Sequence, residues 1–371
     1  MSTRVQRIGL IVAAAALVAL AAGYYVARGS GGETPRKPVG SWTAAAPLVV
    51  PEVSQAAVVL AGGDVLMTGG EDAAGGRPTS VVQRYRVAGA KWSLMAPMKH
   101  DRIGHTATLL RDGRVLAVGG LGVKLQPLRS TEIYDPARNR WTAAAPLPDV
   151  RFSQSATLLP DGRVLVVGGI VHGAISRSVL VFDPRTAAWK AGPPTISPHA
   201  QQSAVALPDG RVLIAGGYGG QAEVYDPKAR RWSQVGGPGV LTHPVVVRLR
   251  DGRVLLATGV DGAGRPSSSS SLFDPNRNRW SSGAAMGTGR DSPAAAVLRD
   301  GRVLVLGGAA NRKVLRSAEV YDPRSNRWAP AASLKQARSA ASATLLRNGR
   351  VLVCGGSRYG TVLSSCELYR A

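Results

Sequence analysis

Hydrophobic residues recur along this chain in short runs bounded by glycine, proline or aspartate. The clearest run follows the tripeptide Asp-Gly-Arg and ends in two glycines, as in segments 112–120 and 161–169. Short apolar runs between turn residues are typical of buried β-strands, and an Asp-Gly step is a strong signal for a tight hairpin. Beyond the N-terminus no stretch keeps the rhythm of an amphipathic helix, so the pattern predicts an all-β chain.

The apolar run occurs seven times, with a divergent first copy. It ends in two glycines in every copy except the fifth, which ends in Thr-Gly. The last residues of the seven copies are Gly70, Gly120, Gly169, Gly217, Gly259, Gly308 and Gly356. Successive copies lie 42 to 50 residues apart. A repeat of about 40–50 residues that forms four strands has the size of one β-propeller blade.

An aromatic signal keeps the same spacing. A tyrosine or phenylalanine precedes a tryptophan by seven positions in the pairs Tyr85–Trp92, Tyr134–Trp141, Phe182–Trp189, Tyr225–Trp232, Phe273–Trp280 and Tyr321–Trp328. Only Trp42 and Tyr369 lack a partner in this series. We therefore expect an N-terminal strand at Trp42 to complete the last blade, which closes the ring and leaves few exposed strand edges.

The glycine doublet, the aromatic residue and the tryptophan seven positions later resemble the signature of the kelch-repeat family, over residues 41–371. The resemblance implies a seven-bladed kelch-type β-propeller, the fold of the central domain of galactose oxidases. Those enzymes use copper with tyrosine and histidine ligands and a crosslinked Cys–Tyr pair. No Tyr-His pair occurs here, and we expect no metal, cofactor or catalytic residue. A kelch-type sialic-acid mutarotase or epimerase needs only a polar, arginine-lined mouth, so a carbohydrate-active enzyme remains the alternative to a binding module.

The N-terminus carries a hydrophobic segment. Residues 8–27 contain no charge, and about 20 apolar residues match the thickness of a bilayer core. We expect one hydrophobic helix in residues 1–27, acting either as a signal anchor or as a cleaved signal peptide. Residues 28–40 read as a flexible linker. Both alternatives place the propeller outside the cytoplasm, in the cell envelope if it is anchored and secreted if the segment is cleaved.

The net charge of +23 favours an anionic partner. Because the propeller is expected outside the cytoplasm, nucleic acid is an unlikely partner. The chain has two cysteines, Cys354 at the end of a predicted strand and Cys366 in the neighbouring one. In an oxidising compartment we expect them to form a disulfide.

One position suggests an anion site. It lies eight residues before the last leucine of each innermost strand and holds Glu52, Arg102, Arg151, His199, Leu241, Arg290 and Arg338. Propeller symmetry is expected to place these side chains around the mouth of the central channel. Arginines there would bind an acidic peptide, an acidic glycan or an anionic envelope polymer. The alternative is that they hold the incoming loop as part of the scaffold.

The two faces of the propeller differ in sequence. One carries the uniform Asp-Gly-Arg and Asp-Pro turns. Each arginine of the Asp-Gly-Arg turns is next to an aspartate or asparagine, and we expect a solvated turn there and not a site. The other carries the variable loops, where binding is usual. All five histidines fall on the variable face, at His100, His105, His172, His199 and His243. They lack the spacing of metal ligands.

Overall fold

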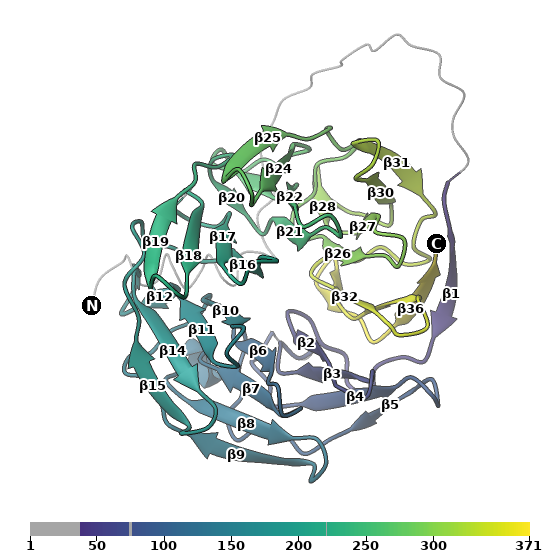
Figure 1. The fold of residues 1–371 in the computed structure, drawn as a ribbon. Helices are drawn as coiled ribbons and strands as arrows, with labels where there is room; N and C mark the ends of the chain where they lie inside the picture. The colour runs from purple at the N-terminus through teal and green to yellow at the C-terminus, as the bar shows by residue number, and fades with distance from the viewer. Residues whose placement is uncertain (1–37, 74–75, 220) are drawn as a thin grey trace.

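The computed structural model describes residues 38–73, 76–219 and 221–371. Over these residues, seven four-stranded antiparallel sheets surround a central channel (Figure 1). The predicted seven-bladed β-propeller is confirmed. The hydrophobic segment 8–27, predicted to be a helix, and most of the linker 28–40 lie outside the described residues. Within the described part, no helix has the length and hydropathy of a membrane span.

The strands of each blade are called a to d from the channel outward. Strands a line the channel and are β2 (Ala56–Val59), β6 (Thr106–Leu109), β10 (Ser155–Leu158), β16 (Ser203–Ala206), β21 (Val245–Arg248), β26 (Ala294–Val297) and β32 (Ser342–Leu345). Strands b are β3 (Val65–Thr68), β7 (Val115–Val118), β11 (Val164–Val167), β17 (Val212–Ala215), β22 (Val254–Ala257), β27 (Val303–Leu306) and β33 (Val351–Cys354).

The two outer strands carry the aromatic pairs. Strands c are β4 (Val82–Arg86), β8 (Thr131–Asp135), β14 (Val179–Asp183), β18 (Glu223–Asp226), β24 (Ser270–Asp274), β30 (Ala318–Asp322) and β36 (Cys366–Arg370). Strands d are β5 (Lys91–Leu94), β9 (Arg140–Ala144), β15 (Ala188–Ala191), β19 (Arg231–Gln234), β25 (Arg279–Ser282), β31 (Arg327–Ala331) and, in the seventh blade, β1 (Ser41–Ala45).

Short elements lie in the loops between the blade strands. Two-residue strands form the pairs β12 (Ile170–Val171) with β13 (Ala174–Ile175), β20 (Leu241–Thr242) with β23 (Val260–Asp261), β28 (Ala309–Ala310) with β29 (Lys313–Val314), and β34 (Ser357–Arg358) with β35 (Thr361–Val362). A single turn of 3-10 helix, η2, covers Val123–Leu125.

The hydrophobic core is divided among the gaps between neighbouring blades. Every residue of every strand b is buried. In one such cluster Leu116 and Val118 of the second blade pack with Val164 and Val166 of the third. Burial of apolar area stabilises the fold by roughly 25 cal/mol per Å², so each blade depends on both of its neighbours.

The glycine doublets allow loops to pass close to the ends of strands b. Gly168 and Gly169 have φ of +62° and +90°, a region that glycine enters without the steric cost of a Cβ. A Cβ at Gly168 would lie 2.2 Å from the carbonyl oxygen of His199, and one at Gly169 would lie 2.7 Å from that of Phe152. The doublet therefore lets the loops before two adjacent strands a close over strand b.

The ring closes as predicted. β1 pairs with β36, and Trp42 lies opposite Tyr369 with ring centroids 5.0 Å apart. The carbonyl oxygen of Val39 accepts hydrogen bonds from the Tyr369 hydroxyl and the Ala332 amide. In the second blade, Asn139 Oδ1 of the turn between strands c and d accepts the equivalent two bonds. Residues 38–40 thus take the place of that turn in the seventh blade.

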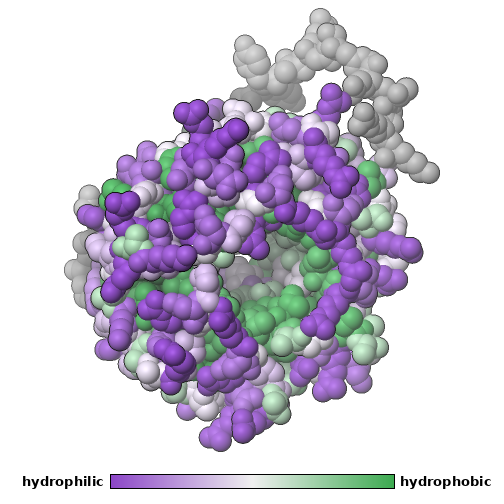
Figure 2. All heavy atoms as spheres, viewed as in Figure 1, coloured by the Kyte–Doolittle hydropathy of each residue, from purple (hydrophilic) through white to green (hydrophobic). Residues whose placement is uncertain are grey.

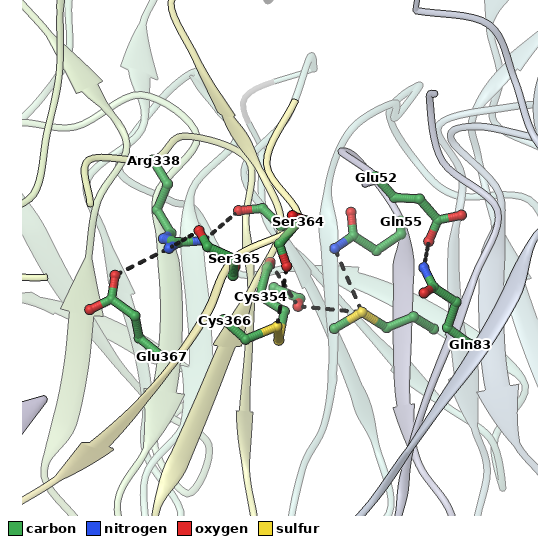
Figure 3. Close-up of a disulfide and its surroundings, with 12 residues drawn as sticks. Glu52, Gln55, Gln83, Arg338, Cys354, Ser364, Ser365, Cys366 and Glu367 are labelled. Atoms are coloured by element: carbon green, nitrogen blue, oxygen red, sulfur yellow. Dashed lines mark hydrogen bonds and ion pairs between the residues drawn. A yellow bond between two sulfur atoms is a disulfide. The ribbon is translucent and has the colours of Figure 1, made fainter. Parts of the chain in front are cut away.

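The predicted disulfide joins Cys354 to Cys366, with Cα atoms 4.2 Å apart (Figure 3). The two residues lie directly opposite each other in β33 and β36, and both are buried. The bond links strands b and c of the seventh blade, next to the closing strand β1.

Replacing both cysteines by alanine is expected to lower the free energy of unfolding by about 2–4 kcal/mol, because the crosslink restricts the unfolded chain. Denaturant unfolding of the oxidised protein and the double variant measures this difference. Thiol titration of unfolded, unreduced protein is the check, since two free thiols would contradict the bond.

Candidate ligand site at the channel mouth

The channel opens into a cavity of about 450 Å³ at the end where the strands a begin. Its lining comes from the loops between strands d and a of all seven blades and from Glu71, which lies in the loop between strands b and c of the first blade. The lining residues are Ser54, Glu71, Ile103, Gly104, His105, Ser153, Gln154, Gln201, Gln202, His243, Pro244, Ser292, Pro293, Ala340 and Ala341. Figure 2 shows one face of the molecule, on which hydrophilic residues lie around a central opening whose edge is in part hydrophobic.

A left-handed residue recurs in each of these seven loops. The residues are Ser54, Gly104, Ser153, Gln201, His243, Ser292 and Ala340, with φ between +48° and +60°. For non-glycine residues this conformation costs roughly 1 kcal/mol or more, so surrounding contacts must hold it. Three contacts join neighbouring loops: Ser153 N–H donates to Gly104 O, Gln201 N–H to Ser153 O and Ala340 N–H to Ser292 O. Backbone hydrogen bonds therefore link the loops of the second, third and fourth blades, and those of the sixth and seventh.

The wall of the cavity is polar on one side and apolar on the other. Blades two to four contribute His105, Gln154 and Gln202 at the position just before strand a. Blades five to seven contribute Pro244, Pro293 and Ala341 at that position. The fold thus produces a cavity with hydrogen-bonding groups facing an apolar surface.

Two glutamines of the polar wall also link blades. Gln154 Nε2 donates to the carbonyl oxygen of Val118 at 2.8 Å, and Gln202 Nε2 donates to that of Val167 at 2.8 Å. Gln201 differs, because its side-chain amide has no hydrogen-bond partner anywhere in residues 38–73, 76–219 and 221–371. It is half-buried at the rim. His105, Gln154 and Gln202 are bonded through one side-chain atom, and each keeps a second buried polar atom (Nδ1, Oε1 and Oε1) without a partner among the described residues.

The charged groups at the rim are acidic. Burial and the neighbouring Asp72 raise the pKa of Glu71. Burial acts to raise the pKa of Asp291, but hydrogen bonds from His243 and Ser292 outweigh it and leave that pKa below its ordinary value. Burial and the charge of Arg102 lower the pKa of His105 to about 3, so this imidazole is neutral at physiological pH.

The four arginines expected at the channel mouth lie inside the blades instead. Arg102, Arg151, Arg290 and Arg338 are at most 1% exposed. Each donates to the carbonyl oxygen of the first doublet glycine in its own blade, namely Gly119, Gly168, Gly307 and Gly355. Only the Nε–H of each side chain is left without a partner in the described residues.

A glutamate of strand c forms an ion pair with three of the four buried arginines. Arg338 Nη2 lies 3.1 Å from Glu367 Oε1 (Figure 3). The same contact joins Arg102 to Glu132 and Arg290 to Glu319. The Glu367 oxygens also accept the backbone amides of Lys335 and Gln336 in the loop before strand a. The ion pair therefore ties that loop to strand c.

The remaining members of the set have other partners. His199 lies 2.9 Å from Glu223, whereas Arg151 has Ser178 Oγ and faces no glutamate. Glu52 accepts from Gln83 and Thr79, and burial raises its pKa to about 7. Leu241 is buried in an apolar cluster. None of these residues forms the open cationic ring that the sequence suggested, and their contacts favour the scaffold alternative.

Each histidine has a partner near it. His100 lies beside Glu132, His172 beside Asp149, His243 beside Asp291 and His199 beside Glu223. The Nε2 atom of His105 lies 2.9 Å from Thr68 Oγ1. His105 and His243 both line the cavity.

Sequence reasoning missed the residues that line the cavity, which come two and three positions after the expected arginines. A signal was present. The third position holds Gln55, His105, Gln154 and Gln202 in the first four repeats and apolar residues in the last three. The polar side of the cavity wall therefore comes from the earlier repeats of the chain, and the apolar side from the last three repeats.

Comparisons with known proteins support the architecture. Residues 104–148, 151–195 and 292–335 match the Kelch motif. A fungal alcohol oxidase of the AA5 family, solved in complex with copper, matches with a TM-score of 0.76 and 21% identity, over 89% of this chain and 76% of that one. No curated protein matches the chain. At this identity the likeness shows the fold alone.

The residues at the mouth do not fit a copper centre of that kind. The cavity lining contains no tyrosine or cysteine, and its two histidines are bonded to Thr68 and Asp291. Both cysteines are in the disulfide. In the described part of the chain, no three His, Cys, Asp or Glu side chains are grouped closely enough to hold a metal ion.

Proposed function

Because this chain is a kelch-repeat β-propeller, we propose that it is a binding module whose mouth cavity takes a small, uncharged ligand rich in hydroxyl groups. The observation that carries the proposal is the unpartnered amide of Gln201 at the rim of a preformed cavity of about 450 Å³. Ligand sites are typically concave and largely preformed, with a few polar groups that fix orientation.

The two-sided wall supports a sugar ring as the ligand class. A pyranose presents hydroxyl groups at its edge and C–H groups on one face. The amides of Gln201 and Gln202 are suited to the hydroxyl groups, and Pro244 and Pro293 to the C–H face. Glu71 in the lining, with Asp291 next to the lining residue Ser292 and bonded to His243, disfavours an anionic ligand in this cavity.

Display outside the cytoplasmic membrane is part of the proposal. It is supported by the uncharged run of residues 8–27 and the arginines that flank it, which favour a cytoplasmic N-terminus. Val39 and Gly40 enter the last blade at its rim, so the segment preceding the propeller is positioned to act as a tether.

The enzyme alternative has less support. A mutarotase- or epimerase-like reaction would use Glu52, Arg102 and Arg338, yet each of these is buried and bonded within its own blade. The fold likeness to an alcohol oxidase brings no matching copper ligands. A sugar incubated with the protein is therefore expected to be bound and released unchanged.

The test is saturation-transfer NMR of neutral monosaccharides with the full chain. Gln201→Ala is expected to weaken binding about fivefold to tenfold, since a lost hydrogen bond typically costs about 1 kcal/mol. Gln234→Ala, at an exposed glutamine on the outer strand β19, is the matched control. Binding that is unaltered in Gln201→Ala would place the ligand elsewhere.

A further inference from the structure

The opposite end of the channel carries exposed arginines that lack acidic partners. Arg111, Arg250, Arg299 and Arg347 occupy equivalent positions in the turns between strands a and b, and all four are exposed. No carboxylate of the described residues lies within ion-pair distance of them. The neighbouring aspartates Asp112, Asp251 and Asp300 are bonded instead to the arginine two residues further on.

These four side chains follow the rim of the channel. The side chain of Arg111 packs against Gly162 of the next blade, that of Arg250 against Gly301, and that of Arg299 against Gly349. Arg347 reaches the first blade, where it packs against Gly63 and donates to the carbonyl oxygen of Ala61. Each guanidinium therefore points toward the next blade. The four, from the second, fifth, sixth and seventh blades, form an incomplete inner ring of positive charge.

A second ring lies farther out on the same side. The first residue of strand d, just before the tryptophan, is Lys91, Arg140, Arg231, Arg279 or Arg327 in five blades, and all five are exposed. They too lack an ion-pair partner among the described residues. The turns between strands a and b and between c and d therefore form one cationic surface, called the turn face below.

The chain enters the propeller from this face. The Val39 carbonyl replaces a side chain of the turn between strands c and d, and Ser41 pairs with Arg370 at the end of the last strand c. Ten residues, 28–37, separate this point from the hydrophobic segment 8–27. A chain of that length spans at most about 36 Å when extended and averages about 17 Å when flexible.

We propose that the turn face docks on the anionic lipid headgroups of the membrane that holds residues 8–27, an inference that rests on the membrane display proposed above. The short tether keeps the two rings of unpaired cations near that surface. Headgroup phosphates supply the missing negative charge, and guanidinium groups bind them with paired hydrogen bonds. The mouth cavity, at the other end of the channel, then faces away from the membrane and is open to its ligand.

The test reconstitutes the full chain in vesicles of phosphatidylcholine alone or mixed with phosphatidylglycerol. Energy transfer from the tryptophans to dansyl-labelled headgroups reports the distance of the turn face, because each of the seven tryptophans is the second residue of a strand d, next to a turn of that face or, for Trp42 in β1, next to the residues that replace it. The wild type is expected to show high transfer on anionic vesicles. Salt should reduce it to the value on neutral vesicles.

Two matched variants lose the same number of charges. The first replaces Arg111, Arg250, Arg299 and Arg347 by glutamine, and the second replaces Lys124, Arg312, Lys313 and Arg358, which are exposed on the opposite face. Each basic residue near an anionic surface raises the membrane affinity about fivefold. Loss of four such residues should therefore lower the affinity of the turn face for anionic vesicles by roughly several hundredfold. The second should behave as the wild type.

Four results would count against the inference. Equal transfer by the first variant and the wild type would overturn it, as would loss of transfer in the second variant alone. Equal energy transfer on neutral and anionic vesicles, with the protein still in the membrane, would overturn docking on anionic headgroups. It would leave the proposed membrane display of the propeller standing. Release of the wild type from both kinds of vesicle by alkaline carbonate contradicts the display itself, and tethered docking with it.

Discussion

Replacement of Arg338 by methionine is expected to lower the free energy of unfolding by about 3–5 kcal/mol, the usual cost of breaking a buried ion pair from one side. The guanidinium is fully buried and contacts Glu367, Ser365 and the carbonyl oxygen of Gly355. Without it, Glu367 remains buried as an uncompensated charge. Denaturant unfolding of the full chain measures the loss.

The chain supplies a matched comparison in the third blade. Arg151 has the same glycine carbonyl and serine contacts as Arg338 but no glutamate. Arg151→Met is therefore expected to cost clearly less than Arg338→Met. Arg163→Met, at an exposed arginine paired with Asp161, should cost at most about 1 kcal/mol. Equal losses in the first two variants would show that the ion pair itself contributes little.

The positions of these arginines could be predicted from the sequence, but the directions of their side chains could not. The repeat period located all of them in equivalent loops, because period is a property of the sequence. It did not indicate that the side chains turn into the blades, since this direction is set by contacts with strand c. The partner was nonetheless visible: the residue two before the tyrosine is glutamate in the repeats that contain Arg102, His199, Arg290 and Arg338.

The turn face illustrates the same limit. Its repeated Asp-Gly-Arg turns predicted solvated arginines, and the structure adds that the aspartates pair with those arginines. The pattern did not separate them from the arginine that precedes the aspartate, as in Arg111 and Arg250. The turn geometry directs the carboxylate forward along the chain, which leaves the preceding cation unpaired. Conformation, rather than composition, decides which charges remain available.

Ring closure was predictable because it depended on two residues that broke a regular series. Trp42 is 9% exposed and packs on Tyr369. Its indole N–H donates to the carbonyl oxygen of Ala332 in the preceding blade. These contacts hold the N-terminal strand β1 against the last two blades, and so close the ring by non-covalent contacts.

Deleting residues 41–46 from the full chain is expected to destabilise the propeller more than any substitution considered above. The deletion removes all of β1, exposes the backbone edge of β36 and opens the cluster that contains Trp42, Leu334 and Tyr369.

Trp42→Ala alone should lower the free energy of unfolding by about 3–5 kcal/mol, as for other buried tryptophans. Ser41→Ala, at an exposed position of the same strand, is the control and should change little. Thermal unfolding followed by tryptophan fluorescence ranks the three proteins. A deletion variant that unfolds at the same temperature as the wild type would mean that the seventh blade is stable with three strands. Pairing of β1 with β36 would then contribute little to the stability of the propeller.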